Sequence, residues 1–409
     1  MKKVLIAIIA LLLIALGLLV LKKENRRIVP EEPEVPEAPH SQITGDFTSN
    51  IIKLTNRDNK DNFLISPYSI KVALNMLKEG ADGNTLAQIN KVLANTKVAN
   101  IDNPNIKIAN AVFISNRVKD IVEESFVNTI KNNYQGEVLY DNFKTPKVIN
   151  DWVNEHTNKM IPKLLDSMEP NFVAGLANAI AIDVKWAYQF DCPLTTKEEF
   201  TKKDNTTMNV QMMHHSYETS DVSYFDNDKT LGVILPYTAD TNLEFVGFIP
   251  KGNIDNYLNS VTSTELANIG QDAISAGNKL HIELSLPRFK YDFDLKTFQG
   301  ILQEMGMTDA FIEGVADFSK IIPKDKDEVS VSEAIHKTAI DLNEKGTKAA
   351  AVTYFGLKDS AAIIPEDFKT VKIELNKTFV YMIREKTTKE ILFFGVVNTP
   401  NKWSGSTCE

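Results

Sequence analysis

The pattern of apolar and polar positions divides the chain into a part typical of helices and a later part typical of strands. Five segments repeat apolar residues every three or four positions, as helices with one buried face do: residues 47–56, 69–80, 85–95, 126–134 and 148–160. Later segments are short apolar runs or alternate in polarity, which predicts strands: residues 231–237, 243–250 and 279–289. Residues 294–306 predict one more helix, and residues 379–384 and 390–397 a terminal hairpin around "EKTTK". Helices first and antiparallel strands later favour an α+β fold.

The N-terminus contains an unbroken apolar run, residues 4–21, with basic residues on both sides. As a helix it would span ~27 Å, enough for the hydrocarbon core of a bilayer. A cleaved signal peptide usually has a shorter apolar stretch, and the small-residue site Ala15-Leu16-Gly17 lies inside the run. Residues 1–28 are therefore predicted to be a membrane anchor or a signal peptide, with the anchor favoured. In both cases we expect the rest of the chain to be extracellular, either anchored to the membrane or secreted.

The remaining chain is predicted to be one domain after a spacer. Residues 29–44 alternate Pro and Glu, a composition that stays extended and cannot pack a core. We find no internal repeat and no second linker, so residues 45–403 are predicted to form one domain and residues 404–409 a tail.

Composition excludes some functions. The chain has 409 residues, is 43% apolar, and carries a formal charge of −9. It therefore lacks the basic field that nucleic-acid binding requires. Its two cysteines, Cys192 and Cys408, match no metal-binding spacing and allow one disulfide at most. We expect Cys192 to be a small buried residue and Cys408 to lie in the tail, and the disulfide between them remains open.

Signatures of catalysis are not found in the sequence. GxSxG, HExxH, the P-loop and GxGxxG do not occur. His214 and His215 would point to opposite faces of a strand, and no third ligand is spaced near them, so we expect no metal site. His336 is interpreted as a hydrogen-bonded core histidine. No catalytic residue and no cofactor is assigned, and an enzyme is the least favoured class.

Residues 343–356, "NEKGTKAAAVTYFG", have an unusual composition for a strand. In an extended conformation Thr347, Ala349 and Ala351 share one uncharged face, while Lys348 and Ala350 lie on the other. Alanines have weak strand propensity, and a long polar run follows. An ordinary edge strand with a mobile loop is one reading. A functional loop is the other, because long irregular loops on compact domains are usually functional.

Four motifs resemble the serpin family, and the resemblance covers residues 46 to 402. They are "NFLISPYSIKVALNMLKEGA", "LANAIAIDVKWAYQF", "AIHKTAIDLNEKGTKAA" and "NKTFVYMIREKTTKEILFFGVVNTP". The resemblance implies helices packed around three β-sheets, with an exposed reactive-centre loop. In serpins this loop is cut by a protease and then inserts into the main sheet as a new strand. Such insertion is one of the recognised forms of strand addition.

The resemblance also implies roles for particular residues. The hinge would comprise Glu344, Gly346, Thr347, Ala349, Ala350 and Ala351. Counting from Gly346 places the reactive bond at Ser360–Ala361, with Lys358 or Asp359 as alternatives, because the following segment is longer than usual for the family. Ser66, Asn178 and His336 would form the polar group beneath the centre of the main sheet, and Trp186 would lie near its top. Lys348 replaces the acidic residue usual in the family and falls on the outward face.

The resemblance implies an inhibitor that traps a serine protease as a covalent acyl-enzyme. The alternatives are a non-inhibitory binding protein with the same fold and an inhibitor of cysteine proteases. Expected partners are the target protease and, if residues 4–21 are retained, a membrane. We expect a monomer, no nucleic-acid partner and no cofactor. The frequent Lys and Asn residues suggest a prokaryotic source.

Overall fold

The computed structural model describes residues 45–94, 96, 98, 101, 106–218, 220–276, 280–332, 334–347 and 369–404. These residues belong to one compact unit, Ser41–Glu409. The N-terminal apolar run and the Pro/Glu segment lie outside the described residues. Within the described part, no helix combines the length and the apolar character that crossing a membrane requires.

The helices begin where the sequence supplies capping residues. Asp46 accepts a hydrogen bond from the Ser49 amide at the start of α2, and Ser66 does the same for the Ser69 amide of α3, with Pro67 in the first turn. The helices of the described residues are α2 (Phe47–Asp58), α3 (Pro67–Gly80), α4 (Gly83–Leu93), α5 (Glu124–Asn133), α6 (Lys147–His156), α7 (Ile254–Ser260), α8 (Ser263–Ala267) and α9 (Phe298–Glu304).

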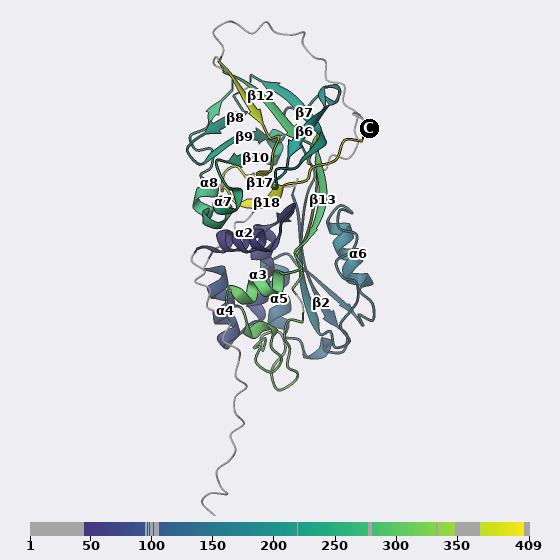
Figure 1. Cartoon of the computed structure of the whole chain (residues 1–409). Helices are drawn as coiled ribbons and strands as arrows, with labels where there is room; N and C mark the ends of the chain where they lie inside the picture. Colours follow the sequence, from purple (N-terminus) through teal and green to yellow (C-terminus); the bar gives the residue numbers. More distant parts are fainter. Residues whose placement is uncertain are drawn as a thin grey trace, which may run out of the picture. The chain divides into compact units, whose positions relative to one another are not determined.

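A seven-stranded sheet contains the terminal hairpin and forms the centre of the core (Figure 1). Its strands, in spatial order, are β1 (Phe63–Ile65), β18 (Ile391–Val397), β17 (Phe379–Glu385), β10 (Leu243–Pro250), β9 (Thr230–Pro236), β8 (Ser223–Asp226) and β11 (Ile274–Ser275). β10, β17 and β18 are buried along their whole length. The predicted hairpin, the helix near residue 300 and the strands of the second half are therefore confirmed, with shifted ends.

A second sheet has four strands, of which one edge strand follows the segment expected to be the reactive-centre loop. In spatial order they are β16 (Lys369–Glu374), β12 (Leu280–Pro287), β7 (Thr207–Tyr217) and β6 (Thr196–Thr201). β16 runs parallel to β12, whereas the other pairs are antiparallel.

A third region, which we call the main sheet, consists of two hydrogen-bonded parts. The first part contains β3 (Glu137–Asp141), β2 (Ile106–Ser115) and β4 (Ala174–Ile182). The second contains β13 (Phe289–Asp294), β14 (Lys337–Asn343), β15 (Gly346–Thr347) and β5 (Val184–Lys185). Because β5 directly continues β4, the two parts are joined at one end only. The described residues thus form four hydrogen-bonded sheets instead of the three expected, because the main sheet is divided between β4 and β14.

Helix α6 covers one face of the main sheet. Trp152 and Ile149 of α6 belong to a cluster with Phe113 of β2 and Ala177 of β4, and the Trp152 and Phe113 rings meet edge to face at 5.7 Å. Val112 of β2 belongs to the larger core on the opposite side. β2 is therefore buried on both faces, and its sequence shows a nearly continuous apolar run instead of alternation.

Three expectations need correction. The strands β2 and β3 lie in the first half, where the pattern had predicted mainly helices. α6 ends at His156, whereas the pattern predicted a helix to residue 160; Asn158 and Lys159 have φ values of 52° and 62°, so the chain leaves the helix there. Cys192 is half-buried, where a buried residue was expected, and it is disulfide-bonded, which the sequence had left open. Cys408 lies outside the described residues.

Candidate functional site at the opening of the main sheet

The segment predicted to be the hinge enters the main sheet at β15. Gly346 and Thr347 pair with β5 on one side and with β14 on the other. Gly346 has a φ of 153°, and a Cβ atom at this position would lie 2.1 Å from the carbonyl oxygen of Val184. Only glycine allows this close approach between the two backbones.

Glu344 anchors the chain just before the hinge. Its side chain is 7% exposed, and both carboxylate oxygens accept hydrogen bonds of 2.7 Å from Nε of Arg288. The hydroxyl of Thr195 donates to the same carboxylate, and the amide of Phe190 donates to the Glu344 carbonyl at 3.0 Å. Charged hydrogen bonds in a site of low water content are strong, so this group of contacts, which we call the Glu344 clamp, fixes the position of the hinge.

Two aromatic rings hold the same region from the core side. The indole of Trp186 is 2% exposed, stacks on the ring of Tyr237 at 4.6 Å, and donates from Nε1 to the carbonyl of Asn343 at 2.9 Å. The hydroxyl groups of Tyr237 and Thr347 are 2.6 Å apart and form a buried hydrogen bond. Burial raises the pKa of Tyr237 well above its usual value, so the phenol stays protonated at neutral pH.

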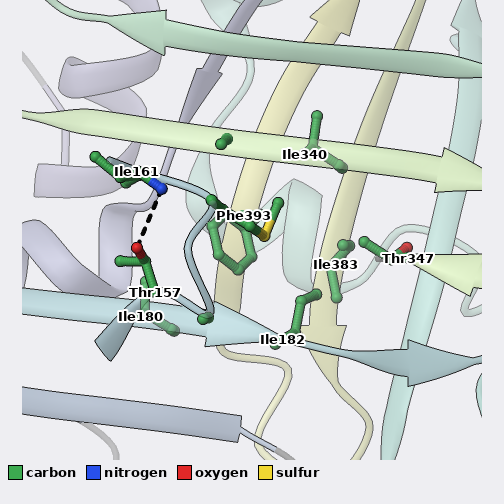
Figure 2. A pocket seen from close by; sticks show the side chains of 11 residues that line it. Thr157, Ile161, Ile180, Ile182, Ile340, Thr347, Ile383 and Phe393 are labelled. Atoms are coloured by element: carbon green, nitrogen blue, oxygen red, sulfur yellow. Dashed lines mark hydrogen bonds between the residues drawn. The ribbon is translucent and has the colours of Figure 1, made fainter. Parts of the chain in front are cut away.

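Next to this segment, β4 and β14 face each other across a small pocket of about 20 Å³ (Figure 2). Ile180 and Ile182 of β4 line one side, and Ile340 of β14 lines the other. Among the described residues, β4 pairs only with β2, and residues 337–341 of β14 pair only with β13. Each of the two strands therefore presents one unpaired edge toward the pocket.

The pocket is closed by side chains from two different layers. Ile161 and Thr157, in the segment that follows α6, line it on the helix-covered side. The amide of Ile161 donates to the hydroxyl of Thr157 at 3.1 Å, as Figure 2 shows. Ile383 of β17 and Phe393 of β18 line it from the core. The opening is therefore apolar and suits small or apolar side chains better than charged ones.

The predicted polar group, Ser66, Asn178 and His336, lies at the other end of the space between β4 and β14. Asn178 belongs to β4, and His336 directly precedes β14. Asn178 of β4 accepts from the hydroxyl of Ser69 and donates to the side-chain carbonyl of Asn110 at 2.7 Å. On the other side, Nε2 of His336 accepts from the amide of Ser66 at 3.0 Å. Burial lowers the pKa of His336 to about 4, so the ring is neutral at pH 7. Ser66 and Ser69 both belong to the start of α3, which thus connects the two sides.

The structure brings part of the predicted set together. Glu344, Gly346, Thr347 and Trp186 lie at the hinge, and Ser66, Asn178 and His336 lie at the other end of the opening. The remaining predicted residues, Ala349, Ala350, Ala351, Lys358, Asp359, Ser360 and Ala361, lie outside the described residues.

Sequence reasoning did not identify Arg288, Thr195 or Tyr237. Arg288 directly follows the strand β12, and a cation next to so many apolar residues signals a buried partner. The sequence could not show which carboxylate this is, because Arg288 and Thr195 are 56 and 149 residues away from Glu344.

A family model described as serpin (serine protease inhibitor) matches residues 42–400. The chain belongs to the serpin family.

The comparisons with individual proteins extend over most of the chain. An uncharacterised serpin-like protein of Methanosarcina acetivorans is 29% identical and covers 89% of this chain and 87% of its own. Thyroxine-binding globulin of Rattus norvegicus is also 29% identical, over 88% of each chain. The crystal structure of tengpin, a thermophilic serpin, in the native state has a TM-score of 0.74 and 29% identity, with 87% of this chain and 92% of that chain covered.

Proposed function

We propose that this protein inhibits serine-type endopeptidases as a suicide substrate and is not itself an enzyme. The observation that carries the proposal is the pair of unpaired strand edges of β4 and β14, with the hinge residue Thr347 already paired at their upper end. A strand that continues from Thr347 between these edges would form hydrogen bonds on both sides. About ten such bonds, each worth ~0.5–1.5 kcal/mol net, would supply on the order of ten kcal/mol.

The chemistry proposed for the inhibitor is that of an interrupted proteolysis. The serine hydroxyl of the protease attacks the carbonyl of the scissile peptide, the amine of the following residue leaves with a proton, and an acyl-enzyme ester remains. Insertion of the loop then carries the bound protease along the main sheet before water can hydrolyse the ester. A strand of ~14 residues at ~3.3 Å per residue moves it by roughly 45 Å.

The residues at the hinge support insertion. Thr347 is small, 2% exposed, and its hydroxyl has a partner in Tyr237, so it occupies the sheet without an unpaired polar group. Gly346 allows the backbone to cross closely over β5. The reactive bond is proposed at Ser360–Ala361, where small residues suit proteases with shallow specificity pockets. We also propose that the protein acts outside the cytoplasm, anchored or secreted through its N-terminal apolar run.

A second candidate is a non-inhibitory binding protein with the serpin fold. It is favoured by the similarity to thyroxine-binding globulin, whose name describes binding of thyroxine. The unpaired edges and the small hinge residue favour inhibition instead, because a carrier does not require a strand to enter the main sheet. Inhibition of a cysteine protease would use the same loop and a thioester in place of the ester.

The test is incubation of the protein with a panel of serine and cysteine proteases, followed by denaturing gel electrophoresis and a measurement of residual protease activity. We expect a complex that resists SDS with at least one serine protease. Thr347→Arg would place a guanidinium in the closed space beside Tyr237, so this variant should be cut without complex formation. Thr207→Arg, at an exposed threonine, is the matched control and should behave as the wild type. If the wild-type loop is cut while every protease stays active, the proposed function is wrong.

A further inference from the structure

A glycosylation signal of the form Asn-x-Ser/Thr occurs twice in the chain, as "NTT" at residues 205–207 and as "NKT" at residues 376–378. In such a signal the asparagine side chain accepts the sugar, and the hydroxyl two positions later is bound by the transferase. A folded chain can use the signal only where both groups face solvent. The sequence alone does not separate the two signals, whereas the structure does.

The first signal lies in the turn between β6 and β7. Asn205 is exposed and has a φ of 64°, a left-handed backbone that asparagine tolerates better than most residues. Thr206 and Thr207 are exposed as well. Within the described residues, neither the Asn205 side chain nor the Thr207 hydroxyl forms a hydrogen bond. Both groups that a transferase must reach are therefore accessible.

Other atoms hold this turn in place. The amide of Lys202 donates to the carbonyl of Thr206 at 2.8 Å, and the amide of Asn205 donates to the carbonyl of Lys202 at 3.0 Å. The carboxylate of Asp204 accepts from the amide and from the hydroxyl of Thr206, at 2.9 and 2.6 Å. A sugar on the Asn205 side chain would break none of these bonds, so the modification is compatible with the native turn.

The second signal is part of the packed structure. Thr378 is 9% exposed, and its hydroxyl donates to Oδ1 of Asn398 at 2.7 Å. Thr201 of β6 pairs with the same segment: its amide donates to the Asn376 carbonyl at 2.9 Å, and its carbonyl accepts from the Thr378 amide at 3.0 Å. A transferase that bound the Thr378 hydroxyl would have to break these contacts, so the folded chain does not present the second signal.

From the exposure of one signal and the burial of the other, we propose that Asn205 is an acceptor site for an N-linked glycan and that Asn376 is not. The proposal rests on the export of the chain, which is one part of the proposed function, and not on protease inhibition. A glycan of this kind is bulky and hydrophilic and lies on the protein surface. Since the turn contributes no residue to the hinge or to the opening between β4 and β14, variants without the glycan, including Thr207→Arg, should trap proteases as the wild type does.

The transfer needs a lipid-linked oligosaccharide as the donor. The amide nitrogen of Asn205 forms a bond to C1 of the first sugar, and the bond between C1 and the phosphate oxygen of the donor breaks. The electron pair of that bond leaves with the lipid phosphate, and the amide nitrogen gives up one proton. The reaction is a group transfer in which nothing is oxidised or reduced.

The first experiment tests the acceptor in the folded, full-length protein. The purified chain is incubated with a single-subunit oligosaccharyltransferase and its lipid-linked oligosaccharide, and glycopeptides are identified by mass spectrometry. We expect one glycan per chain, at Asn205. Synthetic peptides of residues 200–210 and 371–381 are the matched control, and both should be modified, because neither peptide is folded.

Substitutions in the turn test the assignment. Asn205→Asp keeps a residue that tolerates the left-handed backbone but removes the acceptor amide, so the mass increase should disappear. Thr207→Val should also abolish it, whereas Thr207→Ser keeps the hydroxyl and should retain it. Melting temperatures of the unmodified variants should equal that of the unmodified wild type, which separates loss of the acceptor from loss of the fold.

The second experiment tests whether the exported chain is modified. The full-length protein is translated in the presence of microsomes, and translocation is measured as resistance to added protease. We expect a protected chain that carries one glycan. The glycan should be removed by endoglycosidase H and should be absent from Asn205→Asp.

The outcomes separate this proposal from the proposed function. An unmodified Asn205 in the folded protein, equal modification of Asn205 and Asn376, or a protected chain without a glycan would each overturn the proposal. A chain that is not protected would show that export is wrong, and the glycan with it. If Asn205 is modified but no protease is trapped, the glycosylation site stands and the inhibitor function is wrong.

Discussion

The Glu344 clamp makes a quantitative prediction for the substitution Glu344→Gln. Both carboxylate oxygens bond to a guanidinium that is itself only 16% exposed. Hydrogen bonds that involve a charged group contribute ~1.5–3 kcal/mol each. Glutamine keeps one neutral acceptor for Arg288 but removes the negative charge of the carboxylate. Because both side chains are largely buried, water can replace the lost interaction only in part. We therefore expect the native form to lose about 2 kcal/mol.

The assay follows two quantities, the urea midpoint of the native form and the rate at which intact protein converts to the inserted form. If the clamp contacts are lost in the transition state for insertion, a loss of about 2 kcal/mol corresponds to a roughly 30-fold faster conversion. The urea midpoint should fall at the same time, because the same contacts stabilise the native form.

A double-mutant cycle with Arg288→Gln tests whether the effect belongs to the pair. Glu344→Gln and Arg288→Gln should each be destabilising, and the double variant should lose less than the sum by about 1–3 kcal/mol. If the two effects add to within ~0.5 kcal/mol, or if the conversion rate of Glu344→Gln equals that of the wild type, the clamp does not control the hinge and the reasoning fails.

The remaining predictions concern the two ends of the opening. Gly346→Val should disrupt the pairing of β15 with β5 and lower the melting temperature, because a Cβ atom at this position would lie 2.1 Å from a backbone oxygen. The control is Gly300→Ala in α9, where an added Cβ atom would have no other atom within 4 Å. This control should be neutral or stabilising by up to ~1 kcal/mol. Burial lowers the pKa of His336 from its ordinary value of 6.5 to about 4 in the folded protein. Its contribution to native stability is therefore complete above pH 6.5 and is lost as the pH falls toward 4, by about 3 kcal/mol in total. Urea midpoints measured between pH 7.5 and pH 4.5 should show this loss in the wild type and a smaller one in His336→Gln; equal slopes would refute the assignment.

Local pattern predicted the helices well where one face is buried and a cap is present. α3 shows this, since Ser66 and Pro67 fix its start and apolar residues recur along one face. The end of α6 could not be predicted, because the helical pattern of residues 148–160 continues through Asn158 and Lys159, whose left-handed backbone is a property of the tertiary structure. The strand β2 was missed because burial on both faces removes the alternation that identifies strands.

The candidate site was predictable only through the resemblance to a family. Glu344, Gly346 and Trp186 belong to segments that resemble known motifs, so their roles could be expected. Arg288 and Thr195 reach Glu344 through contacts between distant parts of the chain, and the division of the main sheet between β4 and β14 depends on which edges pair. Local periodicity of the sequence predicts neither these long-range contacts nor the division of the main sheet.

The pairing of Thr347 between β5 and β14 has a consequence for the kinetics of insertion. Starting a new strand usually requires a search in which two chain segments meet and lose conformational entropy before any bond forms. Here Gly346 and Thr347 are already paired with β5 and β14, so insertion can proceed by elongation of an existing strand. A longer downstream segment should then change the rate only slightly, since doubling a loop costs about 0.6 kcal/mol. The lifetime of the uncut form should consequently depend on the strength of the contacts that hold β4 and β14 in place. It should depend very little on the length of the segment that follows Thr347.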